Sequence, residues 1–409
     1  MILANRINPK HISLLFFIIY FAIGINIVKD YGISLDEPEN RQQGFILLNH
    51  IGEKIIPNIT QEIKGDRDFV NIYDYPGGYT IDNVFNYTSS LFEIIFKIKD
   101  DNSAYLLKHY LNFIIFFSSL IVFYFVNKKL FKSHYLALLS CIFLALSPRI
   151  FANQFYSPRD IILLSSVVFL LGSFILYLER NKIIDLIILS FFTALCFNIR
   201  VLAIYFPVIL LSLDFFFFRR KIKNYFFYAV FCTLFFILIS PTAWNLNLYD
   251  NIFTRLFVNV NPSWFFTYVK YLDNIYPITD LPWHYNFVWI GITTPFLITL
   301  LFVIGLIFLV FQKKGEVDLI KYIILLFSVV SIFLPIIIII FRNPFLLNGW
   351  RYIYFIYPFI VIISIYGFQK IYNKKKNILS FLFVYIIFLH TAYYCYWIVK
   401  NHPYQNVYF

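Results

Sequence analysis

The chain has 409 residues, of which 60% are hydrophobic, 22% aromatic and only 14% charged. Soluble domains contain about 25% charged residues, so this composition excludes an ordinary soluble protein. The net charge of +12 suggests nucleic-acid binding at first sight. Its basic residues lie in short segments between long apolar runs, however, which is typical of a membrane protein and not of a nucleic-acid-binding one.

Apolar runs of roughly 18 residues or more, long enough to cross ~30 Å of hydrocarbon, recur along the chain. They are continuous and do not alternate with polar residues, which excludes a β-barrel. We predict a single all-α polytopic membrane domain over residues 1–409, with about eleven spans. The first run lacks a small-residue cleavage site and is predicted to be a retained span. The predicted spans cover residues 12–28, 106–126, 134–148, 160–178, 184–198, 201–218, 225–241, 286–311, 319–341, 352–368 and 378–399.

The loop charges predict the orientation of these spans. With the N-terminus in the cytoplasm, the inner segments hold 18 of the 34 basic residues and only five of the 22 acidic ones. This is the positive-inside pattern. We therefore expect a multi-pass protein of the cytoplasmic (inner) membrane with a cytoplasmic N-terminus, an extracytoplasmic C-terminus and contacts with anionic membrane lipids.

The first outer loop, residues 30–105, holds 13 of the 22 acidic residues. Residues 40–56 and 84–98 each carry apolar residues at helical spacing, which predicts two amphipathic helices at the membrane interface. A polar, turn-rich stretch that includes Pro76, Gly77 and Gly78 separates them. Loops of this length often carry function.

Asp36 and Glu37 follow the first span directly, within Ser34-Leu35-Asp36-Glu37-Pro38-Glu39. Two adjacent carboxylates beside a bilayer cost free energy, so we expect them either to be solvated or to have a function. One interpretation is a solvated cap on a helix that begins near Pro38. The other is that Asp36 is the catalytic base of a transferase whose site faces away from the cytoplasm.

The later outer loops are short, apart from residues 242–285, and carry arginines and aromatic residues. Arg200 lies between two apolar runs and needs water or an anion there. All six tryptophans fall on the predicted outer side, so some are candidate stacking platforms for a sugar ring, although an interfacial belt explains most of them. The four cysteines have no metal or redox spacing, and no His, Asp and Glu cluster has convincing metal spacing.

Several of these motifs occur in a familiar order along the chain. They are Asp36-Glu37, Leu146-Ser147-Pro148-Arg149 with Ser157-Pro158-Arg159-Asp160, Asn198-Ile199-Arg200, Leu281-Pro282-Trp283-His284-Tyr285 with Ile292-Thr293-Thr294-Pro295, and Asn348-Gly349-Trp350-Arg351. The ordered set resembles the bacterial GT-C superfamily membrane glycosyltransferases related to protein O-mannosyltransferases and aminoarabinose transferases. Each motif is weak alone, but the set covers nearly the whole chain.

The resemblance implies a polyprenyl-phosphate sugar donor and an acceptor on the outer face of the cytoplasmic membrane. It assigns the aspartate base to Asp36, with Glu37 beside it, and a second acidic residue to Asp160. Arg200 and Arg351 match the cations near the donor phosphate. Some superfamily members hold a divalent ion on their acidic residues, so the resemblance does not decide whether this protein needs a divalent cation. Many members continue into an outer soluble tail, so we expect that a chain ending at Phe409 is short or truncated.

Further substrate-binding candidates are Arg159, His284, Trp350 and His109. Two of them have a plain alternative: Arg159, like Arg149, as a lipid headgroup anchor, and His284 as an interfacial residue. Asp160 could equally cap the helix that starts beside it. The candidate acceptors are a protein, a lipid or a glycan.

A transporter or flippase of a lipid-linked sugar is the alternative function. It would also need membrane helices and outer cations. Transporters place charged residues near the bilayer midplane, whereas here the charges gather at the outer face. A structural membrane subunit would explain neither Arg200 nor the acidic pair.

Overall fold

The computed structural model describes residues 8–55, 72, 82–244, 268–312, 315–342, 344, 346, 349–374 and 378–408. The first span is α1 (Pro9–Ile27), which continues into the short helix η1 (Val28–Asp30). The first outer loop then contributes α2 (Glu37–Ile55) and α4 (Val84–Ile95). These match the two predicted amphipathic helices, and α2 begins three residues earlier than expected. The predicted turns at Pro76, Gly77 and Gly78 lie outside the described residues.

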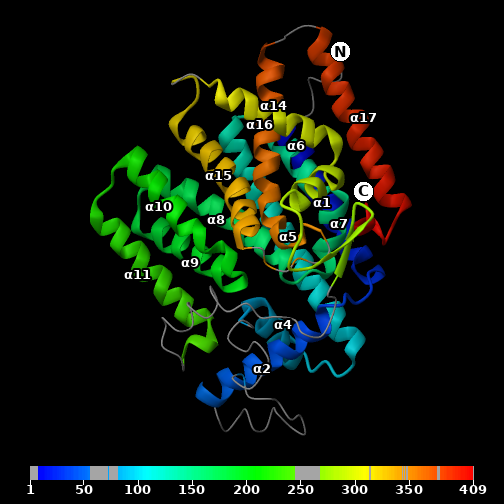
Figure 1. The fold of residues 1–409 in the computed structure, drawn as a ribbon, viewed down its shortest axis with the longest axis vertical. Helices are drawn as coiled ribbons and strands as arrows, with labels where there is room; N and C mark the ends of the chain where they lie inside the picture. The colour runs from blue at the N-terminus through cyan, green and yellow to red at the C-terminus, as the bar shows by residue number, and fades with distance from the viewer. Residues whose placement is uncertain are drawn as a thin grey trace.

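The middle of the chain supplies helices from the centre of the bundle to one edge of it (Figure 1). It contains α5 (Asp101–Phe131), α6 (His134–Ala145), α7 (Pro148–Tyr156), α8 (Asp160–Arg180), α9 (Ile183–Ile199), η3 (Val201–Ile204), α10 (Tyr205–Phe218), α11 (Ile222–Ile239) and η4 (Pro241–Trp244). Local sequence sets several of these ends. The Asp100 side chain accepts from Ser103 N–H at the start of α5, at 2.8 Å, and Pro148 occupies the first turn of α7.

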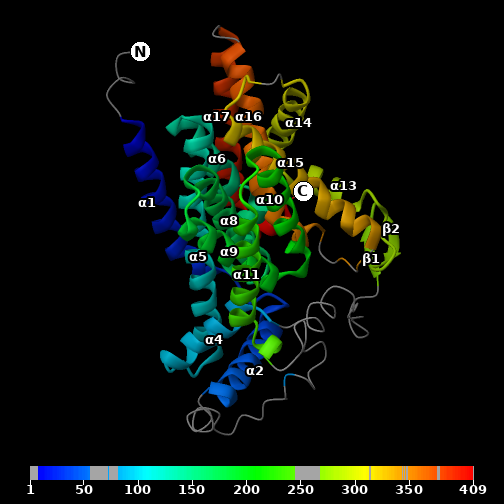
Figure 2. The same ribbon diagram turned by 90° about the vertical axis from the view of Figure 1, so that its left-hand side faces the viewer.

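The last third of the chain begins with a hairpin of β1 (Tyr268–Tyr271) and β2 (Asn274–Pro277), paired antiparallel. It continues through α13 (Tyr285–Thr293), α14 (Phe296–Val310), α15 (Leu319–Arg342), η5 (Arg351–Ile356), α16 (Tyr357–Lys374), α17 (Ile378–Lys400) and η6 (Gln405–Val407). The hairpin lies beside α13 at the edge of the bundle (Figure 2). Trp264 and Asn348, which belonged to the predicted outer loops, are outside the described residues.

The predicted all-α membrane architecture is confirmed, but the count of eleven spans is not. Among the described residues, eight helices are long and apolar enough to cross a membrane. The pair α6 and α7 makes a ninth candidate only as a broken span, bent by 69°. The predicted spans at residues 184–198 and 286–311 correspond to shorter apolar helices, Ile183–Ile199 and Phe296–Val310. The predicted span at residues 286–311 is interrupted before Pro295, because proline supplies no N–H and restricts the backbone of the residue before it.

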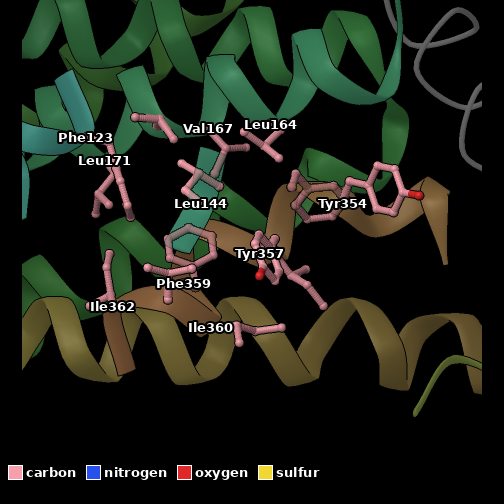
Figure 3. Packing of buried hydrophobic residues seen from close by; sticks show 14 of the residues in the cluster. Phe123, Leu144, Leu164, Val167, Leu171, Tyr354, Tyr357, Phe359, Ile360 and Ile362 are labelled. Carbon is pink, nitrogen blue, oxygen red and sulfur yellow. The ribbon is translucent and has the colours of Figure 1, made fainter. Parts of the chain in front are cut away.

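The core lies between α5, α6, α8 and α16. The apolar window of α8 is 83% buried and that of residues Arg351–Asn373 is 89% buried, which marks them as the central helices. Phe123, Leu144, Leu164, Tyr357 and Phe359 interdigitate there (Figure 3). Helices α1, α11 and α17 bury little of their surface and form the periphery.

One end of the bundle carries a layer made of α2 and α4, at the bottom of both views (Figures 1 and 2). The two helices pack closely because Gly44 has no side chain at their contact. A Cβ at this position would lie only 2.4 Å from the Asn86 carbonyl oxygen. Buried Asn40, Gln43 and His50 accompany the apolar face of α2. This layer brings the first outer loop against the start of α8.

Candidate functional site

The turn into α2 separates the roles of the two adjacent carboxylates. Asp36 directly precedes the helix, and its carbonyl accepts from Asn40 N–H at 3.0 Å. The side chain of Asp36 remains 44% exposed and forms an ion pair with Arg351, 2.6 Å between Nη2 and Oδ2. Glu37 instead turns inward, and its Oε2 accepts from Ser34 N–H at 2.6 Å. Asp36 thus stands directly before the helix, as the cap interpretation expects, and its half-exposed carboxylate is also paired with an arginine.

Glu37 and His109 form a pair buried in the protein. The distance from His109 Nε2 to Glu37 Oε1 is 2.8 Å, and both side chains are almost fully buried. His109 lies on α5, so this contact fastens the start of α2 to a central helix. The catalytic role suggested for Glu37 and the substrate-binding role suggested for His109 stay predictions, and the contact that the structure shows is between the two side chains.

Arg351 links the two acidic residues that the sequence singled out. It lies at the start of η5, and its Nε is 4.0 Å from Asp160 Oδ2 while its Nη2 pairs with Asp36. Asp160 begins α8 and is only 4% exposed. The three residues come from the start, middle and end of the chain, and the bundle brings them to one place.

Asp160 has two further partners. It forms an ion pair with Arg200 through Oδ1, and its Oδ2 accepts from the Ser157 hydroxyl at 3.2 Å. Arg200 sits at the break between α9 and η3, where the extended backbone lets its side chain turn toward α8. A buried carboxylate is stable only when it is paired and hydrogen-bonded, and Asp160 meets both conditions.

Tyr352 lies between the two arginines and was not singled out from the sequence. The guanidinium carbon of Arg200 is 4.7 Å from the centre of the Tyr352 ring, and that of Arg351 is 5.2 Å away. An aromatic face stabilises a nearby cation without neutralising it. Its position directly after Arg351 was the only available signal, because a lone tyrosine in an aromatic-rich chain does not stand out.

Arg159 completes the group from the turn before α8. Its Nη2 donates to Gln43 Oε1 on α2, and Gln43 is buried. Burial lowers the pKa of Arg159 from its ordinary value, and the positive charge of Arg200 lowers it further. Arg159 therefore contacts protein and neighbours Arg200, which does not fit the headgroup-anchor alternative.

Three N–H groups in this cluster have no hydrogen-bond acceptor. The Nε atoms of Arg159, Arg200 and Arg351 are all buried and form no hydrogen bond among the described residues, although Asp160 Oδ2 lies 4.0 Å from that of Arg351. Buried polar groups are almost always satisfied, so orphaned donors mark strain or an absent ligand. Three cationic donors around two carboxylates can bind an anion, because guanidinium groups match phosphate oxygens. We name Asp36, Asp160, Arg159, Arg200 and Arg351 the arginine–aspartate cluster.

Two predicted substrate-binding residues lie apart from these contacts. Trp350 is 1% exposed, and its indole N–H donates to Thr293 Oγ1 at 2.7 Å, so the ring offers no face to a ligand in this structure. His284 Nδ1 lies 2.8 Å from the Tyr271 hydroxyl, next to the β-hairpin.

Arg149, the other suggested headgroup anchor, is buried in the protein. Its Nε donates to the Tyr408 carbonyl at 3.4 Å, and its guanidinium carbon is 5.0 Å from the centre of the Trp289 ring. The anchor expectation is wrong for this residue, because its neighbours are protein groups.

The described residues contain no group of three or more His, Cys, Asp or Glu side chains placed to hold a metal ion. Asp36 and Asp160 are the nearest to such a site. Arg351 already contacts both carboxylates and Arg200 also pairs with Asp160, so a divalent cation would have to displace a guanidinium.

One comparison with known proteins found a match. A sequence model of the dolichyl-phosphate-mannose-protein mannosyltransferase family matches residues 84–244. The match confirms the resemblance to the GT-C superfamily. No curated protein matches the chain significantly.

The matched GT-C region runs from α4 to η4. It contains His109, Arg159, Asp160 and Arg200 but neither Asp36 nor Arg351. The ion pairs of Arg351 join the matched region to the two parts of the site that lie outside it.

Proposed function

We propose that this protein transfers a sugar from a polyprenyl-phosphate donor to an acceptor hydroxyl on the extracytoplasmic face of the cytoplasmic membrane. The observation that carries the proposal is the set of three buried, unpartnered Nε–H groups on Arg159, Arg200 and Arg351. A phosphate oxygen is the acceptor that these donors lack. The GT-C resemblance and the family match support the same donor class.

In this proposal Asp36 is the general base. It is the more exposed carboxylate of the arginine–aspartate cluster and stands at the start of α2, where an acceptor can reach it. In the free protein Arg351 holds it in place. A donor phosphate would compete for the same guanidinium, and this competition would release Asp36 to accept a proton just when the donor is bound.

The proposed reaction is a single displacement at the anomeric carbon. The acceptor oxygen bonds to that carbon and its proton passes to Asp36. The bond from the anomeric carbon to the phosphate oxygen breaks, and its electron pair leaves with the polyprenyl phosphate. Arg200 and Arg351 stabilise the negative charge that develops on the leaving phosphate, with Arg159 beside them. The product then has the inverted anomeric configuration.

Asp160 supports this scheme as an anchor for arginines. It is buried and tied to Arg200, Arg351 and Ser157, which leaves it poorly placed to attack a sugar. A retaining mechanism needs the second carboxylate as a free nucleophile. The contacts of Asp160 therefore favour one base and one displacement. The buried Glu37–His109 pair would act by positioning the turn that carries Asp36.

The proposed orientation has the N-terminus in the cytoplasm and the C-terminus outside. It is supported by contacts near the end of the chain. Gln405 accepts from the Tyr31 hydroxyl at 3.0 Å and His402 pairs with Asp30, so residues 402–405 lie at the Asp36 end of α1, opposite Pro9. The basic residues gather at the Pro9 end, which the positive-inside rule assigns to the cytoplasm.

The decisive experiment gives the purified full chain, in proteoliposomes, a polyprenyl-phosphate sugar with radiolabel in the sugar. A membrane extract serves as the source of acceptors. Transfer of label to an acceptor, with release of polyprenyl phosphate, is the expected result. Movement of intact donor between leaflets without cleavage would contradict the proposal and support a transporter.

A further inference from the structure

The end of the bundle opposite Asp36 holds a charged cavity. It has a volume of about 640 Å³ and lies between the ends of α5, α8 and α16 and the start of α15. Four lysines line it: Lys129, Lys132, Lys321 and Lys370. Arg351 and Asn373 are the two ends of one 23-residue span, which is roughly 35 Å of helix. The cavity is therefore separate from the arginine–aspartate cluster.

Within the part of the chain that the structure describes, only two of the four lysines have carboxylate partners. Lys129 pairs with Glu179, and Lys370 pairs with Glu316 at 3.4 Å. The remaining acid of the cavity, Asp318, accepts from Ile320 N–H at 3.0 Å and caps the start of α15. Lys132 and Lys321 form no ion pair within the described residues. With four lysines and three acidic residues, the cavity lining carries one positive charge in excess, and neither Lys132 nor Lys321 is in direct contact with a carboxylate of the described residues.

Lys321 is held in place rather than left free in solvent. Its ammonium donates to Gln369 Oε1 at 2.6 Å and lies 4.6 Å from the centre of the Phe131 ring and 5.6 Å from that of Tyr366. These contacts orient the charge but do not cancel it. A fixed, half-buried cation with unused N–H groups is suited to bind an anion.

An apolar groove adjoins this cavity. It has a volume of about 560 Å³, lies between α6, α16 and α17, and is lined mainly by apolar side chains such as Leu139 and Ile387. Gln369 and Asn373 line both the cavity and the groove. A charged site and an apolar groove that share a wall match a molecule with an anionic head and a hydrocarbon tail.

We propose that this face binds an anionic phospholipid, with its phosphate between Lys132 and Lys321 and an acyl chain in the groove beside Leu139. Basic pockets between helices on the cytoplasmic side are known to suit anionic headgroups. The proposal does not depend on the proposed transferase activity, since it uses different residues at the opposite membrane face.

The test uses the purified, delipidated full chain in detergent micelles. Binding of 1-palmitoyl-2-oleoyl-phosphatidylglycerol is measured by native mass spectrometry against phosphatidylcholine with the same chains. We expect the anionic lipid to bind more tightly, and Lys132→Met and Lys321→Met each to weaken it roughly fivefold. Lys182→Met is the matched control, because Lys182 is an exposed lysine at the same end of the bundle and lies outside the cavity. It should leave binding unchanged.

A third variant tests the source of the ligand. Leu139→Trp fills the groove and should weaken phosphatidylglycerol binding without affecting weak binding of glycerol 1-phosphate. Equal binding of both phospholipids, or unchanged binding in both lysine variants, would overturn the proposal. So would glycerol 1-phosphate binding as tightly as the lipid, since a free phosphate would then be the ligand. Lys132 is exposed, so its variant remains informative if Lys321→Met fails to fold.

Discussion

Arg351 Nη2 lies 2.6 Å from Asp36 Oδ2, which joins a residue near the end of the chain to one near its start. The same guanidinium approaches Asp160 at the start of α8. One side chain thus bridges the two carboxylates that the sequence analysis proposed for catalysis. The bridge explains how Asp36 can be ordered and still partly exposed. An anion that binds Arg351 would therefore compete with Asp36 for the same guanidinium.

The first prediction concerns Asp36→Asn, which keeps the shape of the side chain and removes the base. Single-turnover transfer at saturating donor should fall by about 10² to 10⁴, the usual contribution of a general base. Donor affinity should not fall and should rise if anything, because the variant removes the carboxylate that competes with the donor phosphate for Arg351. The control is Glu53→Gln, an exposed acid at the other end of α2. Near-normal transfer by folded Asp36→Asn protein would contradict the proposed base.

The second prediction concerns the donor phosphate. Arg351→Gln removes a cation that carries an unpartnered N–H, so donor binding should weaken by about tenfold to a hundredfold, as expected for a charged hydrogen bond worth about 1.5–3 kcal/mol. Equilibrium binding of a non-hydrolysable polyprenyl-phosphonate sugar measures this. Arg180→Gln, at the far end of α8, serves as the control and should bind normally. Equal affinities for the two variants would remove Arg351 from the donor site.

The third prediction distinguishes Glu37 from Asp36. Glu37→Gln weakens the buried contact with His109 and the contact with Ser34 N–H, so the free energy of unfolding should fall by about 1–3 kcal/mol. Transfer should be lost mainly through disorder of the Asp36 turn and should recover in part at low temperature. Thermal unfolding and activity at two temperatures measure this. A stable variant with no activity at any temperature would show a direct chemical role instead.

The fourth prediction concerns pH and the layer of α2 and α4. Burial lowers the pKa of His50 from its ordinary value, Lys54 lowers it further, and Glu53 and Asp82 oppose the shift. A histidine with a depressed pKa is neutral in the folded state and takes up a proton more readily on unfolding. The stability of the layer should therefore fall as the pH drops through about 6.5, the ordinary histidine value.

Hydrogen exchange of α2 amides, corrected for the intrinsic effect of pH, checks this. His50→Gln should remove most of the pH dependence between pH 8 and 5. If the variant retains the full dependence, other groups in the layer are responsible.

The fifth prediction concerns the packing of α14 on α16. A Cβ on Gly305 would lie 2.2 Å from the Ile363 carbonyl oxygen, so Gly305→Ala must push backbone apart and should destabilise the protein by about 1–3 kcal/mol. Gly291 in α13 has nothing within 4 Å of the same position, and Gly291→Ala should be neutral or slightly stabilising. Thermal unfolding in detergent compares them. Equal stability of the two variants would show that the helices separate readily.

The sequence by itself determined the membrane architecture and the pair of amphipathic helices. A segment that crosses a bilayer must be continuously apolar and must satisfy its own backbone hydrogen bonds. Such segments can be recognised from the local residue composition. The same reasoning overcounted the long spans, because hydropathy reports neither the break before Pro295 nor the bend between α6 and α7.

Only the tertiary structure decided which polar groups meet. Asp36 and Glu37 are neighbours in sequence, yet one faces Arg351 and the other is buried against His109. Trp350 and Arg351 are likewise adjacent, and only the arginine reaches the cluster. Adjacent side chains on a helical turn point in different directions, and their partners come from distant segments of the chain. Those pairings follow from how the helices pack against one another. Residue type and spacing along the chain do not reveal that packing.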